Sequence, residues 1–164
     1  MIENFKSKSP LKWDVKTLIF VFVGGFTVIY ILSLLTNAAE VAFLMAPFGA
    51  SCVLVFAAWE APLAQPRNVI GGHFLTSVTG LIVSQLLGNH PWSLAIGVGL
   101  ALVVMVLTKT THPPAGANPI IIITSNSTWQ FLLFPVLTGS IILIIMAVLL
   151  NRFVFRRTYP KFWY

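Results

Sequence analysis

The chain has 164 residues, of which 57% are hydrophobic and only 9% charged, and its mean hydropathy is +0.91. Because an ordinary soluble domain carries roughly 25% charged residues, this composition excludes a soluble globular domain and predicts an integral membrane protein. One span needs about 20 mostly apolar residues, so the chain has room for four full spans, or for six if two of them are short or broken.

The net charge of +6 would suggest a nucleic-acid partner in a soluble protein, but here the basic residues lie mainly at the two ends of the chain. They are Lys6, Lys8, Lys12, Lys16, Arg152, Arg156, Arg157 and Lys161. The positive-inside rule then predicts a multi-pass protein of the cell membrane, the inner membrane in a bacterium, with both termini cytoplasmic and no nucleic-acid partner. We expect a basic N-terminal segment over 1–16, a transmembrane domain over 17–151 and a basic C-terminal tail over 152–164.

The first half of the chain predicts one intact helix and one broken segment. Residues 17–36 form an uninterrupted apolar run, long enough for a first transmembrane helix. Residues 41–58 are also apolar but contain APFGAS, and proline and glycine both weaken a helix. The stretch EAPLAQPRN, over 60–68, carries both signs of charge and predicts a loop.

The second half predicts the same order. Residues 69–87 and 93–107 are expected to be helices, and the segment TKTTHPPAGANP follows them. The short apolar run 120–124 and the polar stretch 125–128 come next, and 129–150 predicts a last long helix. Three prolines within THPPAGANP are incompatible with a continuous helix, so this segment is expected to be the second break.

The two breaks resemble one another at a constant spacing of 67 residues. The spacing superimposes Pro47, Gly49, Ala50 and Ser51 on Pro114, Gly116, Ala117 and Asn118, and Gly72 on Gly139. Corresponding interrupted segments mark the repeats of many transporters. The sequence therefore predicts an all-α polytopic membrane protein with two pseudo-repeats of long helix, broken segment and long helix, which is four full transmembrane helices plus two broken or re-entrant segments.

Two topologies fit this pattern. If both broken segments cross the membrane, there are six crossings, and Arg67 and Lys109 lie on the cytoplasmic side with the termini. If both are re-entrant, there are four crossings, and these two residues lie outside. The positive-inside rule favours six crossings, whereas the shortness of the run 119–124 favours four.

Helix starts within the membrane would have a chemical consequence. Asn118 before Pro119 has the pattern of an N-cap followed by a proline, and Ser51 is a good N-cap residue in the other half. The first amide groups of a helix lack acceptors and carry partial positive charge, so two such starts facing one cavity would suit an anion.

Three ionisable side chains lie nearest the breaks, and each has an alternative interpretation. Arg67 can pair with a planar anion, or it marks topology and contacts a lipid headgroup. His112 can donate to a substrate or carry a proton, or it only bonds carbonyls that the prolines leave free. His73 can do the same, or it makes a packing hydrogen bond between helices. The candidate substrate-binding residues are Gly49, Ser51, Arg67, Asn68, His73, His112, Gly116 and Asn118.

Two stretches, APFGASCVLVFAAWEAPLAQPRNVIGGH and THPPAGANP, together resemble the HPP family of small membrane proteins, named for the triplet His112, Pro113 and Pro114. The resemblance extends from about Lys12 to Arg152 and implies a fold usually described with four transmembrane helices. Members in chloroplasts and cyanobacteria are associated with nitrite transport. The resemblance therefore implies transport of nitrite or a similar small anion.

Two other functions remain open: a channel for a small neutral solute such as urea or ammonia, and a non-transporting membrane partner protein. We do not expect an enzyme, a cofactor or a metal site, because the four acidic residues lie outside the long apolar runs and the three histidines are scattered. A single cysteine, Cys52, excludes an intrachain disulfide. We expect a homo-oligomer, because so few helices enclose little room for a solvated path.

Overall fold

The computed structural model describes residues 14 to 163, and this part of the chain is helical without a strand. Lys6, Lys8 and Lys12, and with them most of the expected basic N-terminal segment, lie outside the described residues. The long helices are α1 (Val15–Ala39), α3 (Pro66–Leu87), α4 (Pro91–Leu107) and α6 (Thr138–Leu149). Two π-helical turns, η5 (Leu132–Leu137) and η6 (Leu150–Val154), extend α6 at its two ends.

Both predicted breaks are present as short helices. The first is α2 (Pro47–Cys52), which continues into the π-helical η2 (Val53–Ala57). The second is the 3₁₀ turn η4 (Pro113–Ala117) followed by α5 (Asn118–Thr124). A further 3₁₀ turn, η3 (Pro62–Ala64), lies before α3. The order long helix, short broken helix, long helix therefore occurs twice, and the prediction of an all-α polytopic membrane fold is confirmed.

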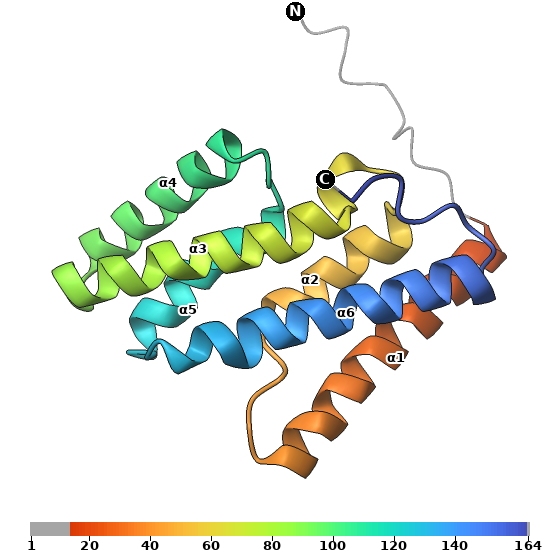
Figure 1. Ribbon diagram of the computed structural model, residues 1–164, viewed down its shortest axis with the longest axis horizontal. Helices are drawn as coiled ribbons and strands as arrows, with labels where there is room; N and C mark the ends of the chain where they lie inside the picture. Colours follow the sequence, from red (N-terminus) through yellow and green to blue (C-terminus); the bar gives the residue numbers. More distant parts are fainter. Residues whose placement is uncertain (1–13, 164) are drawn as a thin grey trace, which may run out of the picture.

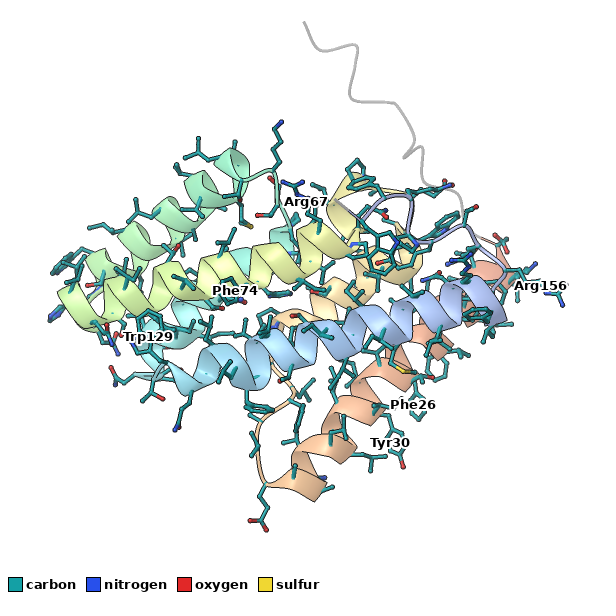
Figure 2. The ribbon with its side chains drawn as sticks, in the orientation of Figure 1. Phe26, Tyr30, Arg67, Phe74, Trp129 and Arg156 are labelled. Carbon is teal, nitrogen blue, oxygen red and sulfur yellow. The ribbon has the colours of Figure 1, made fainter. Side chains whose placement is uncertain are left out.

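Three helical stretches of the described chain are long and apolar enough to span a membrane: Val15–Ala39, Pro66–Leu87 and Leu132–Val154. The fourth expected span, α4, has 17 residues and is shorter. At about 1.5 Å per residue it still extends about 25 Å, close to the thickness of the hydrocarbon core. The outer face of α1 is apolar, and Phe26 and Tyr30 point away from the bundle (Figure 2), as expected for contact with lipid.

The helices α1, α2, α3, α4, α5 and α6 run in turn back and forth between two ends of the bundle (Figure 1). At one end, Phe20 near the start of α1 stacks on Phe155 after α6, with ring centroids 4.2 Å apart. At the same end the Arg67 guanidinium donates to the Thr108 carbonyl over 3.0 Å. At the other end Phe43, which follows α1, contacts Phe134 before α6 edge to face. Each broken segment therefore runs from one end to the other and does not turn back.

Every lysine and arginine in residues 14–163 lies at the first of these ends, which we call the basic end. These residues are Lys16, Arg67, Lys109, Arg152, Arg156, Arg157 and Lys161. Figure 2 shows Arg67 and Arg156 toward this end and Trp129 at the opposite one. The arrangement agrees with the six-crossing version of the predicted topology, in which Arg67 and Lys109 lie on the same side as the termini.

Helix α3 is the centre of the fold, and its glycines let the second break approach closely. It packs against α4, α5 and η4, and also against α6 and η5. A Cβ on Gly80 would lie 2.8 Å from the Cα of Pro119, and a Cβ on Gly72 would lie 2.9 Å from the Thr110 carbonyl oxygen. Small residues of this kind allow close packing in lipid, where no hydrophobic force drives helices together.

The two halves use corresponding glycines in corresponding ways. Gly72 in α3 packs on the second break, and Gly139 in α6 packs on the first, against the Phe43 carbonyl and the Phe48 ring. Each half therefore supplies a glycine that contacts the break of the other half. This crossed packing agrees with the internal duplication predicted from the spacing of 67 residues.

Two boundaries differ from the sequence prediction. The loop expected over 60–68 ends early, because Pro66 occupies the first turn of α3, where a missing amide hydrogen costs nothing. The last helix, expected to be continuous, is interrupted at Phe134, whose backbone is extended (φ −130°, ψ 118°) next to Pro135. A proline inside a helix removes one hydrogen bond and clashes with the preceding turn, and the sequence prediction overlooked it.

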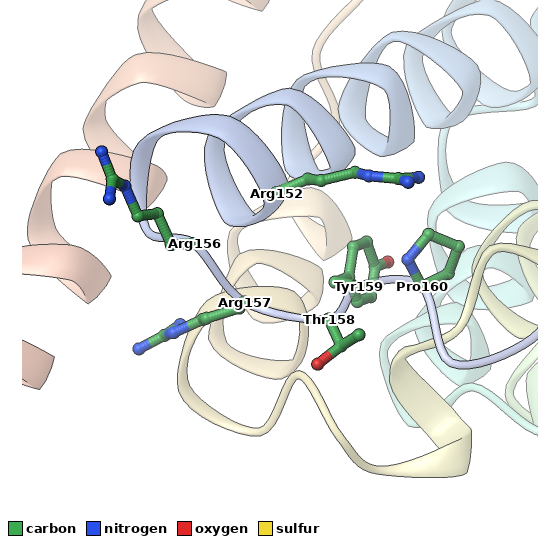
Figure 3. A pocket seen from close by; sticks show the side chains of 6 residues that line it. All are labelled: Arg152, Arg156, Arg157, Thr158, Tyr159 and Pro160. Carbon is green, nitrogen blue, oxygen red and sulfur yellow. The ribbon is translucent and has the colours of Figure 1, made fainter.

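The C-terminal tail folds back on the basic end. The Arg157 guanidinium donates to the Phe56 carbonyl over 2.8 Å and lies over the Phe20 and Trp59 rings. Burial lowers the pKa of Arg157 from its usual value, opposed by nearby Asp14 and Glu60. A hollow of about 390 Å³ lies beside this contact, and Figure 3 shows Arg152 and Arg156 on its rim, pointing away from each other. Arg157 therefore ties the tail to the first broken segment.

Candidate functional site

A cluster of buried polar side chains lies where both broken segments meet α3. Its members are Ser51, His73, Ser77, His112 and Asn118, and none of them has accessible surface. Ser51 comes from α2, His73 and Ser77 from α3, His112 from the residue before η4, and Asn118 from the start of α5. His73 is seven residues into α3, so the cluster lies about 10 Å inside the basic end. We call these five residues the polar cluster.

The Ser51 hydroxyl joins the two histidines. Its Oγ lies 2.9 Å from Nε2 of His73 and 2.8 Å from Nε2 of His112, and also 3.1 Å from the Pro47 carbonyl one turn earlier. The two imidazole rings contact each other edge to face, with an angle of 68° between their planes and 5.0 Å between their centroids. One hydroxyl from the first break thus connects a histidine of α3 to a histidine of the second break.

Asn118 ties the start of α5 to α3. Its Nδ2 lies 2.9 Å from Ser77 Oγ and 3.1 Å from both the carbonyl oxygen and Nδ1 of His73. The carbonyl can only accept, which fixes the amide nitrogen of Asn118 toward α3. Its two hydrogens go to the His73 carbonyl oxygen and Ser77 Oγ, and its Oδ1 lies 3.4 Å from Nδ1 of His73, where it can only accept.

The segment before η4 is held from two sides. Nδ1 of His112 lies 2.8 Å from the Leu63 carbonyl oxygen, and the amide of Asn68 donates to the Thr111 carbonyl over 2.8 Å. The carbonyl groups of Leu63 and Thr111 thus receive side-chain hydrogen bonds in place of helical ones. These bonds keep an extended residue, His112 (φ −141°, ψ 100°), in place inside the membrane.

Chemically, the polar cluster offers neutral donors and acceptors and two groups that can gain a proton. No charged side chain of residues 14–163 hydrogen-bonds to it. Over the same residues, no three histidine, cysteine or acidic side chains come close enough together to hold a metal ion. Every buried side-chain nitrogen and oxygen of residues 14–163 already has a hydrogen-bond partner, so a small polar solute would bind here only by replacing some of these bonds.

The HPP transmembrane region matches residues 10 to 160 of the chain. The chain belongs to the HPP transmembrane family. Two transmembrane proteins of Dictyostelium discoideum are similar to it, one 35% identical over 96% of the chain and the other 33% identical over 97%. The chain spans only 54% and 60% of the length of these relatives. No solved structure matches.

The triplet for which the HPP family is named begins at the polar cluster. His112 is a member of the cluster, and Pro113 and Pro114 start the turn that leads from it to Asn118. Of the candidate residues predicted from the sequence, the structure brings Ser51, His73, His112 and Asn118 together. Asn68 lies beside them through its bond to Thr111.

Arg67, Gly49 and Gly116 do not contact the cluster of this HPP protein. Arg67 is exposed in the first turn of α3, about 9 Å before His73 along the helix, and it bonds the Thr108 carbonyl. A Cβ on Gly49 would meet open space, and one on Gly116 would reach only the Leu102 side chain. The expected pairing of Arg67 with two helix starts is therefore not present.

The expected capping roles of Ser51 and Asn118 were wrong. Ser51 lies in the second turn of α2, whose N-cap is Ala46, and Asn118 is the first residue of α5, whose N-cap is Ala117. Neither helix start has a side-chain cap. Both polar side chains are used instead for bonds to His73, because these connect separate helices inside the bundle.

Ser77 was missed from the sequence, although its spacing gives a signal. It lies four residues after His73 and so shares one face of α3 with it. Gln65 was missed as well. It is fully buried, donates to the carbonyls of Trp59 and Ala61, and accepts from the Lys161 amide, so it holds the loop before α3 to the C-terminal tail.

An apolar groove runs outside the polar cluster, along the contact between the two breaks. It has a volume of about 440 Å³. Its walls are Ala46, Pro47, Ala50, Pro113, Pro114, Ala117, Ile120 and Ile121. Both breaks of this HPP protein therefore present small side chains to the outside of the monomer while their polar side chains point inward.

Proposed function

We propose that this HPP protein moves a small inorganic anion across the membrane through the polar cluster, with nitrite as the first candidate. The observation that carries the proposal is the meeting of both broken segments at one buried polar cluster inside the membrane. Polar and ionisable side chains are costly in a bilayer and commonly mark the path of a solute or proton. Broken helices at membrane depth mark the same sites in many transporters.

The size and hydrogen-bond capacity of nitrite fit such a site. Nitrite is small and accepts hydrogen bonds at each oxygen, and the cluster contains two hydroxyls, an amide and two imidazoles that can donate. Asn118 and Ser51 come from different halves of the duplication, so a shift of one half against the other would open the cluster toward one end at a time. Alternating access by such repeats is the expected mechanism.

A channel for a small neutral solute such as urea or ammonia is the second candidate. Within residues 14–163, no charged side chain is a hydrogen-bond partner of the cluster, and Arg67 is bonded to Thr108 instead, which favours this candidate. A neutral site suits a neutral solute, because no desolvation penalty for a buried ion has to be overcome.

We also propose that the protein is a homo-oligomer whose subunits meet at the apolar groove. Irregular backbone at membrane depth is stable only when protein or a water-filled cavity covers it, and here both breaks line the outer surface. Native mass spectrometry in mild detergent should give a multiple of 18.0 kDa. A monomer under conditions that preserve activity would refute this part.

The basic end is proposed to face the cytoplasm, in a cell membrane. Its seven lysine and arginine residues come from four separate parts of the chain, which is the distribution that the positive-inside rule describes.

Flux through the purified protein in liposomes tests the proposal. Uptake of nitrite, urea and ammonia would each be followed with increasing concentration and compared with empty liposomes of the same lipids. Saturable nitrite uptake without urea uptake supports the anion transporter. Urea or ammonia uptake without nitrite uptake supports the second candidate, and no flux from folded protein would favour a non-transporting partner.

A further inference from the structure

We propose that the basic end binds the phosphodiester headgroup of an anionic phospholipid, at the hollow between the end of α6 and the C-terminal tail. The inference goes beyond the proposed transport and does not depend on which solute the protein carries. Three observations support it: the arginines that line the hollow, the lack of a protein partner for two of them, and an apolar face of α6 that leads to the same place.

The hollow has a volume of about 390 Å³, which is ample for a phosphate group, and it is formed by the chain that follows α6. Its lining residues in the described part of the chain are Arg152, Arg156, Arg157, Thr158, Tyr159 and Pro160, none of them acidic. Figure 3 shows Arg152 extending on the side of Tyr159 and Pro160, whereas Arg156 and Arg157 extend the other way. We call this site the arginine hollow.

Two of the three arginines in the hollow are not engaged by the protein. The Arg157 guanidinium donates to the Phe56 carbonyl and to Oδ1 of Asn151. Arg152 and Arg156 are exposed, and within residues 14–163 neither has a hydrogen-bond, ion-pair or aromatic partner. Both guanidiniums are therefore available to an external anion.

The acidic residues of the basic end are engaged elsewhere. In the described chain these are Asp14 and Glu60. Asp14 accepts hydrogen bonds from the backbone and side chain of Thr17, and Glu60 pairs with Lys161 over 3.2 Å. Neither carboxylate lines the arginine hollow, so the charge there is positive and suits an anion.

An apolar face of α6 favours a lipid headgroup over a free phosphate. Exposed large hydrophobic residues recur at four-residue spacing along α6 and η6, and they are Ile141, Ile145, Leu149 and Phe153. Residues four apart share one face of a helix. This apolar face ends at Phe153, directly after Arg152 in the chain, so an acyl chain can lie along it while the phosphate contacts the arginines.

The chemistry of the arginines fits a phosphodiester. A guanidinium presents a planar fork of donors that matches two phosphate oxygens. Basic residues beside a span attract anionic lipids at the membrane surface. The tail around the hollow also bonds the loop before α3, because the Tyr159 hydroxyl donates to the Ala64 carbonyl and the Lys161 amide donates to Gln65. A bound lipid is therefore expected to stabilise the basic end.

Native mass spectrometry of the full chain tests the site. The protein in a neutral detergent would be titrated with phosphatidylglycerol and, separately, with phosphatidylcholine, whose phosphate is compensated by a positive amine. We expect phosphatidylglycerol to bind about tenfold more tightly. Equal affinity for the two lipids would overturn the proposal.

Charge-matched variants distinguish the arginine hollow from the total charge of the basic end. Arg152→Gln/Arg156→Gln removes two charges at the hollow, and Lys16→Gln/Lys109→Gln removes two exposed charges elsewhere at the same end. We expect only the arginine variant to lose the preference for phosphatidylglycerol. An equal loss in both variants, or no loss in either, would refute the site. The single variants Arg152→Gln and Arg156→Gln provide the same test if the double variant does not fold.

Inorganic phosphate distinguishes a lipid headgroup from a free anion. The unfolding temperature of the wild type would be measured with added inorganic phosphate and, separately, with phosphatidylglycerol in the detergent micelles. We expect only the lipid to raise it, by about 2–4 °C. An equal rise with inorganic phosphate would assign the hollow to a free anion and overturn its assignment to a lipid. None of these measurements involves solute flux, so their failure would leave the proposed function unaffected.

Discussion

Gly72 in α3 lies directly against His112 at the second break: a Cβ on Gly72 would be 2.8 Å from the Cβ of His112. This contact explains how a helix and an extended segment come close enough for His73 to share a hydroxyl with His112. The absence of a side chain at Gly72 therefore sets the geometry of the polar cluster, to which both its chain neighbour His73 and its contact His112 belong.

Gly72→Ala should destabilise the protein and displace His112. The added methyl meets the Thr110 carbonyl and the His112 Cβ, and overpacking of this kind typically costs about 1–3 kcal/mol. The measurement is thermal unfolding in detergent. Gly25→Ala is the matched control, because its Cβ would meet nothing within 4 Å and alanine is the better helix former. Equal unfolding temperatures for the two variants would contradict this account.

Gly139→Ala should be destabilising for the corresponding reason in the other half. Its Cβ would collide with the Phe43 carbonyl and the Phe48 ring at the first break. A cost similar to that of Gly72→Ala, again about 1–3 kcal/mol, is expected because the two glycines play equivalent roles. An unfolding temperature like that of the wild type would speak against the crossed packing of the two repeats.

The six-crossing path predicts on which side each loop lies. A cysteine replacing Lys109 should react with a membrane-impermeant thiol reagent from the same side as the termini, and one replacing Ser125 from the opposite side. Native Cys52 is buried and should not react. Labelling is read out in right-side-out and inverted vesicles. Reaction of the Lys109→Cys protein from the side opposite the termini would restore the four-crossing version.

Asn151→Leu should lower the free energy of unfolding by removing hydrogen bonds at the basic end. The buried Asn151 amide donates to the Val55 and Ala147 carbonyls and accepts from Arg157, so it joins α6 to the first break and to the tail. Leaving the Val55 carbonyl without a donor is expected to cost about 1–3 kcal/mol in unfolding free energy. Gln130→Ala, at an exposed amide, is the control and should change stability little. If Asn151→Leu lost no more unfolding free energy than Gln130→Ala, the proposed role of Asn151 would be contradicted.

The sequence was most informative about the architecture. Length, hydropathy and two proline-rich interruptions predicted an all-α membrane protein with paired breaks, and the spacing of 67 residues identified the glycines that pack on them. Pro135 was missed because the apolar run around it continues on both sides. Hydrophobicity alone does not reveal a kink, so the proline itself has to be taken as the sign that the helix is interrupted.

The site could be predicted only in part. Ser51 and Asn118 were singled out as helix caps, and His73 and His112 as ionisable side chains near the breaks. The structure brings all four together. Their partners could not be predicted, since the side chains of Ser51 and Asn118 had two uses, capping their own helix or bonding α3, and tertiary packing decided between them. Arg67 was misplaced because charge alone does not indicate depth in the membrane.

Two buried serines distinguish whether the meeting point of the two breaks is the transport site, as we propose. Ser51 joins the histidines, whereas Ser140 is equally buried in α6 but, within the described part of the chain, bonds only the Leu137 carbonyl of its own helical segment. Saturable nitrite uptake would be measured in proteoliposomes for wild type, Ser51→Ala and Ser140→Ala, each shown to be folded. We predict that Ser140→Ala transports like wild type and that Ser51→Ala loses most of its uptake. Wild-type uptake by a folded Ser51→Ala protein would contradict the claim.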